Sequence, residues 1–194
     1  EGRVLAIVEE AQATPEQRAI RELNIGVYCF DADWLWGALR RVPLSPKGEY
    51  YLTDVVAIAV SDQLSVSAQL LYDVEEGIGI NTRLHLAEAS AILRQRLNHR
   101  WMLEGVTLID PATTYIEPGV AIGMDTVIWP NTHLQGETSI GAGCVIGPDT
   151  IVRDSRVGNH CELFSSVVEN AVLGDHVEIG PYCHLRKGAH LEQG

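Results

Sequence analysis

The second half of the chain carries aliphatic residues at a regular spacing of six. The spacing is unbroken from residue 116 to residue 152, and after a change of phase the pattern continues to residue 191. A period of six matches no amphipathic helix, but it is three times the two-residue period of a β-strand. Hexapeptide repeats of this kind predict a parallel β-helix over residues 106–194, with three sides to each coil. The aliphatic positions are Ile116, Ile122, Ile128, Leu134, Ile140, Ile146, Val152, Val157, Leu163, Val168, Leu173, Ile179, Leu185 and Leu191.

A second set of positions, four residues after an aliphatic one, holds small or β-branched side chains that we also expect to face inward. The narrow interior of such a coil accepts only small side chains there, which explains three of the four cysteines and predicts that they are unreactive. Glycines that directly follow an aliphatic residue predict corners where a Cβ would not fit. The second set is Val120, Thr126, Thr132, Thr138, Cys144, Thr150, Cys161, Val167, Val172, Val177, Cys183 and Ala189, and the glycines are Gly123, Gly141, Gly147, Gly158, Gly174 and Gly180.

The 82–105 segment has apolar residues at helical spacing and ends in Gly105. Glycine is a common stop just beyond the last turn of a helix, so a linker helix is predicted here.

Residues 1–81 have a different pattern: strand-like runs at 3–10, 25–30 and 64–73 alternate with helical patterns at 31–42 and 50–63. Asp31 or Asp33 and Thr53 are candidate N-caps of those helices. The mixture predicts part of an α/β domain, with too few strands to close a sheet.

Composition narrows the class of protein. A formal net charge of -12 argues against nucleic acid as a partner, because phosphates require clustered Lys and Arg. No apolar run is long enough for a membrane segment. The four cysteines lack the spacing of a zinc site or a disulfide framework, which favours a reducing compartment. The chain begins without a targeting pattern and ends within the repeat, so we expect it to be an internal part of a longer protein.

Several polar residues of the first region stand where strands end or turns form. Glu9 follows an apolar run, Asn24 precedes another, and Gly-marked turns expose Tyr51, Thr53 and Asn81. Loops at strand ends are where α/β domains build sites for small molecules. Each residue alone is more often a cap, a turn residue or a solvated surface group.

Taken together, the motifs IVEE, RELNIGVY, GEYYLTD and GINTRLHL, followed by a helix and hexapeptides, resemble one enzyme family over essentially the whole chain. This is the bifunctional N-acetylglucosamine-1-phosphate uridylyltransferase and glucosamine-1-phosphate N-acetyltransferase family. The resemblance implies an α/β fold, a partial Rossmann-like nucleotidyltransferase domain, followed by a left-handed parallel β-helix of hexapeptide repeats. It implies domains at 1–81 and 106–194 joined by the 82–105 helix.

The resemblance also implies functional residues. Glu9 and Asn24 match residues of the family's sugar pocket, and Asn81 matches a residue that touches the nucleotide sugar and helps to hold Mg²⁺. Tyr51 and Thr53 would lie near the sugar. UTP and acetyl-CoA are the implied co-substrates. The family's Gly-rich phosphate loop and the Asp that shares the metal with Asn81 would precede residue 1. The residue after the sugar-pocket Asn24 is Ile25, where the family usually has Thr or Ser.

In the repeats, LRKG matches the family's LRPG, with Lys187 in place of Pro. Arg186 then corresponds to the Arg that contacts the phosphate of glucosamine-1-phosphate, and a guanidinium suits phosphate. The acetyltransferase base, a His, would lie beyond Gly194. The seven histidines of this chain are expected on the linker helix or at outward positions of the repeat: His85, His99, His133, His160, His176, His184 and His190.

The family resemblance further implies a homotrimer and a cytoplasmic role in supplying UDP-N-acetylglucosamine for the cell envelope. Two alternatives remain open. One is a sugar-1-phosphate nucleotidyltransferase that has a hexapeptide tail but uses another nucleotide or sugar. The other is a non-enzymatic solenoid that only trimerises and carries a degenerate α/β remnant.

Overall fold

The computed structural model describes residues 4–194 and divides the chain after Gly79 into two compact units. The first unit is Glu1–Gly79 and the second is Ile80–Gly194. The structure does not place one unit relative to the other.

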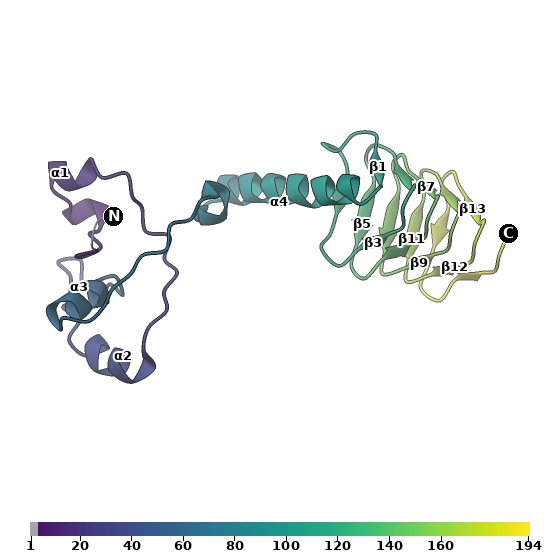
Figure 1. Cartoon of the computed structure of the whole chain (residues 1–194). Helices are drawn as coiled ribbons and strands as arrows, with labels where there is room; N and C mark the ends of the chain where they lie inside the picture. Colours follow the sequence, from purple (N-terminus) through teal and green to yellow (C-terminus); the bar gives the residue numbers. More distant parts are fainter. Residues whose placement is uncertain (1–3) are drawn as a thin grey trace. The chain divides into compact units, whose positions relative to one another are not determined.

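The second unit contains the predicted parallel β-helix (Figure 1). Its strands form three parallel sheets of five, in the orders β1-β4-β7-β10-β13, β14-β11-β8-β5-β2 and β15-β12-β9-β6-β3. Each consecutive strand therefore moves to the next sheet, and every third strand returns to the first. The strands are β1 Thr107–Leu108, β2 Tyr115–Ile116, β3 Ala121–Ile122, β4 Val127–Ile128, β5 His133–Gln135, β6 Ser139–Ile140, β7 Val145–Ile146, β8 Ile151–Arg153, β9 Arg156–Val157, β10 Glu162–Leu163, β11 Val167–Glu169, β12 Val172–Leu173, β13 Glu178–Ile179, β14 His184–Leu185 and β15 His190–Leu191.

The pairing register explains the change of phase in the sequence. Ile128 pairs with Ile146, so that coil is 146 − 128 = 18 residues long. Val152 pairs with Val168, which makes that coil 168 − 152 = 16 residues long. Sides of five residues instead of six shorten the later coils, yet aliphatic side chains stay in register from one coil to the next. All the predicted aliphatic positions are buried or partly buried in one continuous core.

The second inward position is two residues before each aliphatic one, because alternate residues of a strand share a face. Counting four residues after the previous aliphatic gives the same residue only where a side has six residues. On the shorter sides the prediction was wrong: Ser166 and Ala171 are buried, whereas Val167 is only partly buried and Val172 is 43% exposed. Ser155 occupies the same position ahead of Val157 and is also buried.

Hydroxyl and thiol groups in this inward set hydrogen-bond to the backbone of adjacent coils. Thr126 Oγ1 donates to the Gly141 carbonyl at 2.8 Å and accepts from the Cys144 amide at 3.2 Å. Cys144 repeats the pattern one coil later, where its Sγ donates to Gly158 O and accepts from Cys161 N. The buried polar atoms at these corners are thus satisfied by hydrogen bonds between neighbouring coils.

The expected shortage of space at glycine corners is confirmed. A Cβ added at Gly123 would lie 2.5 Å from the Ala142 nitrogen, and one at Gly174 would lie 2.7 Å from the Gln193 nitrogen. Both contacts are with backbone of the next coil, which cannot move aside as a flexible side chain could.

Helix α4, Arg83–Leu103, precedes the solenoid and closes its first coil. Thr82 caps its start by accepting from the His85 amide, and Gly105 with φ +89° ends it. The Val106 amide bonds back to the Trp101 carbonyl at 3.0 Å, the six-to-one bond of a Schellman motif. Trp101 and Val106 both enter the solenoid core, and Asn98 Nδ2 donates to the carbonyls of Pro111 and Thr114.

The first unit is built from short helices: η1 Glu10–Gln12, α1 Pro15–Arg18, α2 Ala32–Leu39, α3 Asp54–Ser61 and η2 Val74–Gly77. The predicted helices at 31–42 and 50–63 are confirmed in shorter form, and α2 and α3 pack around Ala38 and Val55. Asp31, not Asp33, caps α2 by accepting from the Trp34 amide. Thr53 precedes α3, but its side chain makes no capping bond.

The predicted strands at 3–10, 25–30 and 64–73 are not present within residues 4–79, where the structure has only an isolated bridge between Leu44 and Tyr50. Strands need neighbours that take up their backbone hydrogen bonds, and the described residues offer these runs none. Their apolar side chains stay exposed, with Val27 80% and Leu70 63% accessible. The Rossmann-like sheet is therefore not shown by this unit.

One ion pair of the first unit predicts a pH dependence. Both guanidinium nitrogens of Arg41 bond the Asp62 carboxylate at 2.7 and 2.8 Å, and Trp34 Nε1 donates to it at 3.0 Å. The Arg41 bonds, followed by the Trp34 bond, lower the pKa of Asp62 from 3.8 to about 2. A lowered pKa stabilises the folded unit above the ordinary pKa of Asp, and that stabilisation is lost as pH falls through about 2.

We therefore expect Asp62→Asn to reduce the stability of this unit at neutral pH and to flatten its decline between pH 4 and pH 2 (about the range between the unfolded and folded pKa values). Thermal melts of the chain and the variant across that range measure this. An equally steep acid decline in both proteins would contradict the assignment.

Candidate functional site

The Arg186 corner lies between β14 and β15, at the end of the described solenoid. Leu185 points into the core, and the next three residues turn the chain toward β15, with Gly188 at φ +87°. The Ala189 amide donates to the Arg186 carbonyl at 3.0 Å, which closes the turn. Arg186 is exposed and has no ion-pair partner within residues 4–194. Its guanidinium is thus available to an anion from solution.

The same corner of the three preceding coils carries a network of charged and polar side chains. Arg153 donates to Gln135 Oε1 at 2.8 and 3.0 Å and to Glu169 Oε1 at 3.0 Å. The other oxygen of Glu169 lies 3.1 Å from His184 Nε2. Because Glu169 is already neutralised by Arg153, it competes little with an anion for Arg186. The sequence analysis missed this network, although Gln135, Arg153 and Glu169 all directly follow an inward aliphatic residue.

In the first unit, the structure brings Glu9 and Thr53 together across 44 residues of sequence. Thr53 Oγ1 donates to Glu9 Oε1 at 3.1 Å, and the contact is partly buried. Asn24 makes different contacts: its Nδ2 donates to the Tyr28 hydroxyl at 2.6 Å, and its Oδ1 accepts from the Gly26 amide at 3.3 Å. Tyr28 is a partner that the sequence analysis did not single out. Glu9 and Asn24 share no hydrogen bond in the described part of this unit.

Asn81 lies in the second unit, immediately before the N-cap of α4. Its backbone amide donates to His85 Nδ1 at 3.3 Å, while its exposed side chain forms no hydrogen bond to residues 4–194. The Oδ1 atom can therefore supply one oxygen ligand to Mg²⁺, a cation that prefers oxygen. The described residues hold no group of three or more His, Cys, Asp or Glu side chains placed to bind a metal ion. Among the described residues, this position thus offers a single oxygen ligand for Mg²⁺, the side chain of Asn81.

The histidines of the solenoid are at outward positions, as predicted. His133 stacks on Tyr115 with ring centroids 4.5 Å apart, and Arg94 of α4 lies over the other ring at 4.8 Å. His160 and His176 stack on each other at 5.2 Å. These contacts are structural, and we assign the rings no chemical role. Across residues 4–194, no helix is both long and apolar enough to span a bilayer.

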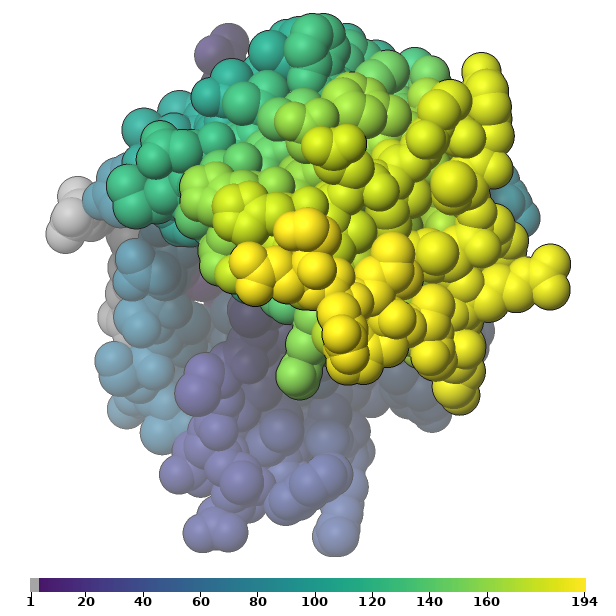
Figure 2. All heavy atoms as spheres, turned by 90° about the vertical axis from the view of Figure 1, so that its right-hand side faces the viewer, coloured from purple at the N-terminus to yellow at the C-terminus, as the bar shows by residue number. Residues whose placement is uncertain are grey.

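The cysteines separate into two classes that a thiol reagent can distinguish. Cys144 and Cys161 are fully buried, and burial raises the pKa of both thiols. Cys29 is exposed, and so is Cys183, contrary to the prediction that its packing makes it inert. Cys183 belongs to the coil of β13, β14 and β15, which is the last coil that the structure describes and faces the viewer in Figure 2.

We expect Cys29 and Cys183 to react with a chromogenic disulfide within the dead time of manual mixing, and Cys144 and Cys161 to react only on unfolding. Cys183→Ser should halve the fast phase of native-state labelling. Fast labelling of all four thiols would contradict the packing of the core.

The repeat defines the class of this solenoid: residues 119–154 match the family described as bacterial transferase hexapeptide, with six repeats. Similarity extends well beyond these residues. The bifunctional protein GlmU of Halalkalibacterium halodurans is 46% identical over 191 residues, 98% of this chain and 42% of that protein. GlmU of Heliobacterium modesticaldum is 47% identical over 99% of this chain and 42% of its own length. GlmU of Lactobacillus delbrueckii subsp. bulgaricus is 43% identical over 100% of this chain and 42% of its own length.

These relatives confirm the resemblance to the bifunctional GlmU family, which the motifs of both halves indicated. The chain spans about 42% of the length of the curated relatives it matches.

Solved structures that match part of this chain share little sequence with it. The acetyltransferase domain of PglB from Neisseria gonorrhoeae is 13% identical and has a TM-score of 0.24 over 53% of this chain and 63% of that domain. PerB from Caulobacter crescentus, solved with CoA and GDP-perosamine, is 12% identical and has a TM-score of 0.26. The match covers 50% of this chain and 61% of the PerB chain. At these scores neither likeness bears on the function.

Proposed function

We propose that the protein containing this chain is a bifunctional enzyme that makes UDP-N-acetylglucosamine. It would transfer an acetyl group from acetyl-CoA to glucosamine-1-phosphate, and then a uridylyl group from UTP to N-acetylglucosamine-1-phosphate. The observation that carries the proposal is the 43–47% identity to bifunctional GlmU proteins along nearly the whole chain, from the first unit to the last coil. A solenoid that had kept only an oligomerising role would not require the polar motifs of the first unit.

For uridylyl transfer, we assign Glu9, Asn24 and Asn81 to sugar binding in a Rossmann-like nucleotidyltransferase domain that residues 1–81 complete in part. A carboxylate and two amides can accept and donate hydrogen bonds to sugar hydroxyls and an acetamido group. Thr53 supports this role of Glu9, because its hydroxyl holds one carboxylate oxygen while the other oxygen forms no hydrogen bond to residues 4–194. The contact between Asn24 and Tyr28 fixes the amide in the same way.

Uridylyl transfer needs no protein nucleophile. An oxygen of the sugar phosphate attacks the α-phosphorus of UTP, the bond from that phosphorus to the bridging oxygen breaks, and pyrophosphate leaves. Positioning and neutralisation of charge provide most of the catalysis in such reactions. Mg²⁺, when bound, neutralises phosphate charge, and Asn81 would provide one of its ligands. The chain's own contribution is to orient the sugar phosphate.

For acetyl transfer, we assign Arg186 to the phosphate of glucosamine-1-phosphate. The residue is exposed, and the neighbouring Glu169 is occupied by Arg153 and His184. The proposal includes left-handed winding of the coil, a homotrimer with sites between neighbouring solenoids, and a cytoplasmic location, where UTP and acetyl-CoA are available. None of the seven histidines is assigned as the base.

Two variants of the complete enzyme test these assignments. Asn81→Ala should lower uridylyl transfer by about tenfold and leave acetyl transfer nearly unchanged, because one oxygen contact to the metal and sugar is lost.

Arg186→Ala should raise the Michaelis constant for glucosamine-1-phosphate by about tenfold and leave uridylyl transfer nearly unchanged, because one charged contact to the phosphate is lost. Equal loss of both activities in either variant would contradict its assignment, and an unchanged Michaelis constant would remove Arg186 from the site.

The alternatives predict other results. A nucleotidyltransferase for another nucleotide would prefer GTP, dTTP or ATP over UTP. A non-enzymatic solenoid would bind neither Mg²⁺ nor UDP-N-acetylglucosamine in a titration of the complete protein.

A further inference from the structure

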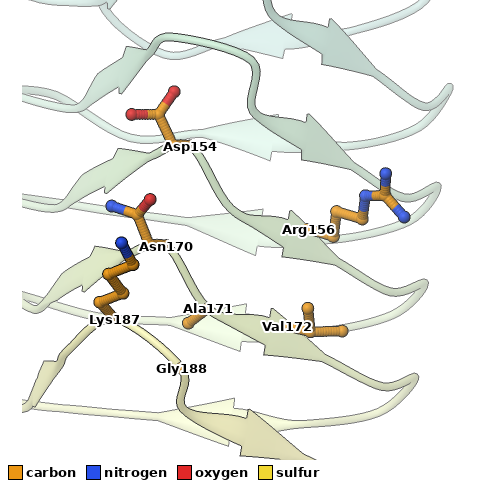
Figure 3. A pocket seen from close by; sticks show the side chains of 7 residues that line it. All are labelled: Asp154, Arg156, Asn170, Ala171, Val172, Lys187 and Gly188. Carbon is orange, nitrogen blue, oxygen red and sulfur yellow. The ribbon is translucent and has the colours of Figure 1, made fainter.

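One column of side chains runs along the corner of the solenoid that contains Arg186. Glu169 pairs with Arg153 in the register of β8 and β11, and Arg186 directly follows Leu185, the partner of Val168 on β11. Arg153, Glu169 and Arg186 therefore occupy the same position in three successive coils. Figure 3 shows the residues that follow them, one below another in the same order: Asp154, Asn170 and Lys187. The column thus places one carboxylate between two guanidinium groups.

Glu169 is within reach of a cation in either neighbouring coil. Adjacent strands of a sheet lie about 4.8 Å apart, so the spacing from Glu169 to Arg186 on one side matches the spacing to Arg153 on the other. A carboxylate and a guanidinium meet at this spacing, because Glu169 Oε1 lies 3.0 Å from Arg153 Nη1. Within residues 4–194, however, Arg186 forms no ion pair. Some feature of the column therefore decides which of the two arginines Glu169 joins.

Contacts to both of its oxygens hold the Glu169 carboxylate. Arg153, which donates to the first oxygen, is itself anchored, since its Nε and Nη2 donate to Gln135 Oε1 at 3.0 and 2.8 Å. The second oxygen of Glu169 lies 3.1 Å from Nε2 of His184 on β14. A carboxylate only accepts hydrogen bonds, so this nitrogen carries the hydrogen. Each oxygen of Glu169 thus has a donor of its own, and neither donor is Arg186.

A carboxylate that joined Arg186 would compete with phosphate for the same guanidinium, whose planar fork of donors one carboxylate or one phosphate fills. It would also repel the phosphate, because both groups are negatively charged. We propose that Arg153 and His184 are positioning residues of the phosphate site, which hold Glu169 away from Arg186 and leave that guanidinium to the phosphate of glucosamine-1-phosphate. Neither residue needs to touch the substrate. The inference rests on the proposed function, because it takes Arg186 as the phosphate ligand.

Replacement of Arg153 in the complete enzyme tests the proposal. Arg153→Met removes the charge and the donors but keeps an unbranched side chain, so Glu169 becomes free to join Arg186. We expect the Michaelis constant for glucosamine-1-phosphate to rise about two- to fivefold, the effect of one exposed ion pair, with kcat nearly unchanged. Adding Glu169→Gln to this variant should return the constant to the wild-type value, because the competing charge is gone. If Arg153 had only a structural role, removal of its partner as well would restore nothing.

His184 allows a second test with a matched pair of variants. His184→Gln keeps an N–H that can donate to Glu169 and should leave the Michaelis constant nearly unchanged. His184→Leu has no donor and should raise the constant. The control is Arg156→Met, which removes the same charge from β9 on another sheet and should leave the constant unchanged. Circular dichroism establishes that each variant is folded.

Arg186→Ala, measured alongside, separates this inference from the proposed function. If Arg186→Ala raises the Michaelis constant but Glu169→Gln does not restore the Arg153→Met enzyme, the positioning role is overturned and the assignment of Arg186 stands. If Arg186→Ala leaves the constant unchanged, Arg186 is not the phosphate ligand and both assignments are overturned. An equal rise in Arg156→Met and Arg153→Met would be a general effect of charge, which also overturns the positioning role.

Discussion

Leu134→Ala is expected to lower the free energy of unfolding of the solenoid by about 2–5 kcal/mol, the range for a fully buried Leu in a close-packed core. Leu134 on β5 has no exposed surface and lies in register between Ile116 and Val152 of the adjacent coils. The loss combines the transfer of the side chain from water with the cavity that remains. Neighbouring coils cannot collapse into that cavity, because their strands are fixed by the pairing on both sides. Chemical denaturation followed by circular dichroism measures the change.

The matched control is Leu103→Ala in the last turn of α4, where the side chain is 76% exposed. It removes the same atoms with little loss of burial, so a change below about 0.5 kcal/mol is expected. If the two variants were equally destabilised, the aliphatic column would not be the interior of the coil.

Gly158→Ala should destabilise the solenoid by about 1–3 kcal/mol or more, although it adds only one methyl group. The new Cβ would lie 2.5 Å from Asp175 Oδ1 and 2.6 Å from both the carbonyl carbon and oxygen of Gly174. Two of these atoms belong to the backbone of the next coil, so relief of the clash requires the coils to separate at this corner. The cost is steric alone, because the φ of Gly158 is outside the left-handed region.

Gly37→Ala provides the opposite control. Gly37 lies inside α2, and a Cβ there would meet nothing within 4 Å. Alanine restricts the unfolded chain and favours the helix, so this variant should stabilise the first unit by about 0.5–1 kcal/mol. Melting temperatures that move in the same direction for both glycine variants would contradict the steric explanation.

The solenoid could be predicted from sequence because its rule is local and repeated. Each aliphatic residue is separated from the next by one side of the coil, so a period of six was visible without knowledge of which strands pair. The prediction failed at Val167 and Val172, where sides of five residues move the inward position. Counting two residues back from each aliphatic would have found Ser166 and Ala171, because that spacing follows from the alternation of a strand.

The first unit and the site were less predictable for a physical reason. Strand formation at 25–30 requires backbone partners distant in sequence, whereas the α2 and α3 helices satisfy their own hydrogen bonds. Local signals therefore found the helices and overstated the strands. In the same way, the contact between Glu9 and Thr53 depends on residues that folding brings together. The sequence indicated them only as separate strand-end and turn residues.

The most direct test of the proposed function is an assay of the complete protein with N-acetylglucosamine-1-phosphate, Mg²⁺ and each of UTP, GTP, dTTP and ATP in turn. Product nucleotide sugar and released pyrophosphate are both quantified, and acetyl-CoA with glucosamine-1-phosphate is assayed separately. The account predicts UDP-N-acetylglucosamine and equimolar pyrophosphate with UTP, and acetyl transfer in the second assay. No turnover in either assay, or faster turnover with another nucleotide than with UTP, would contradict it.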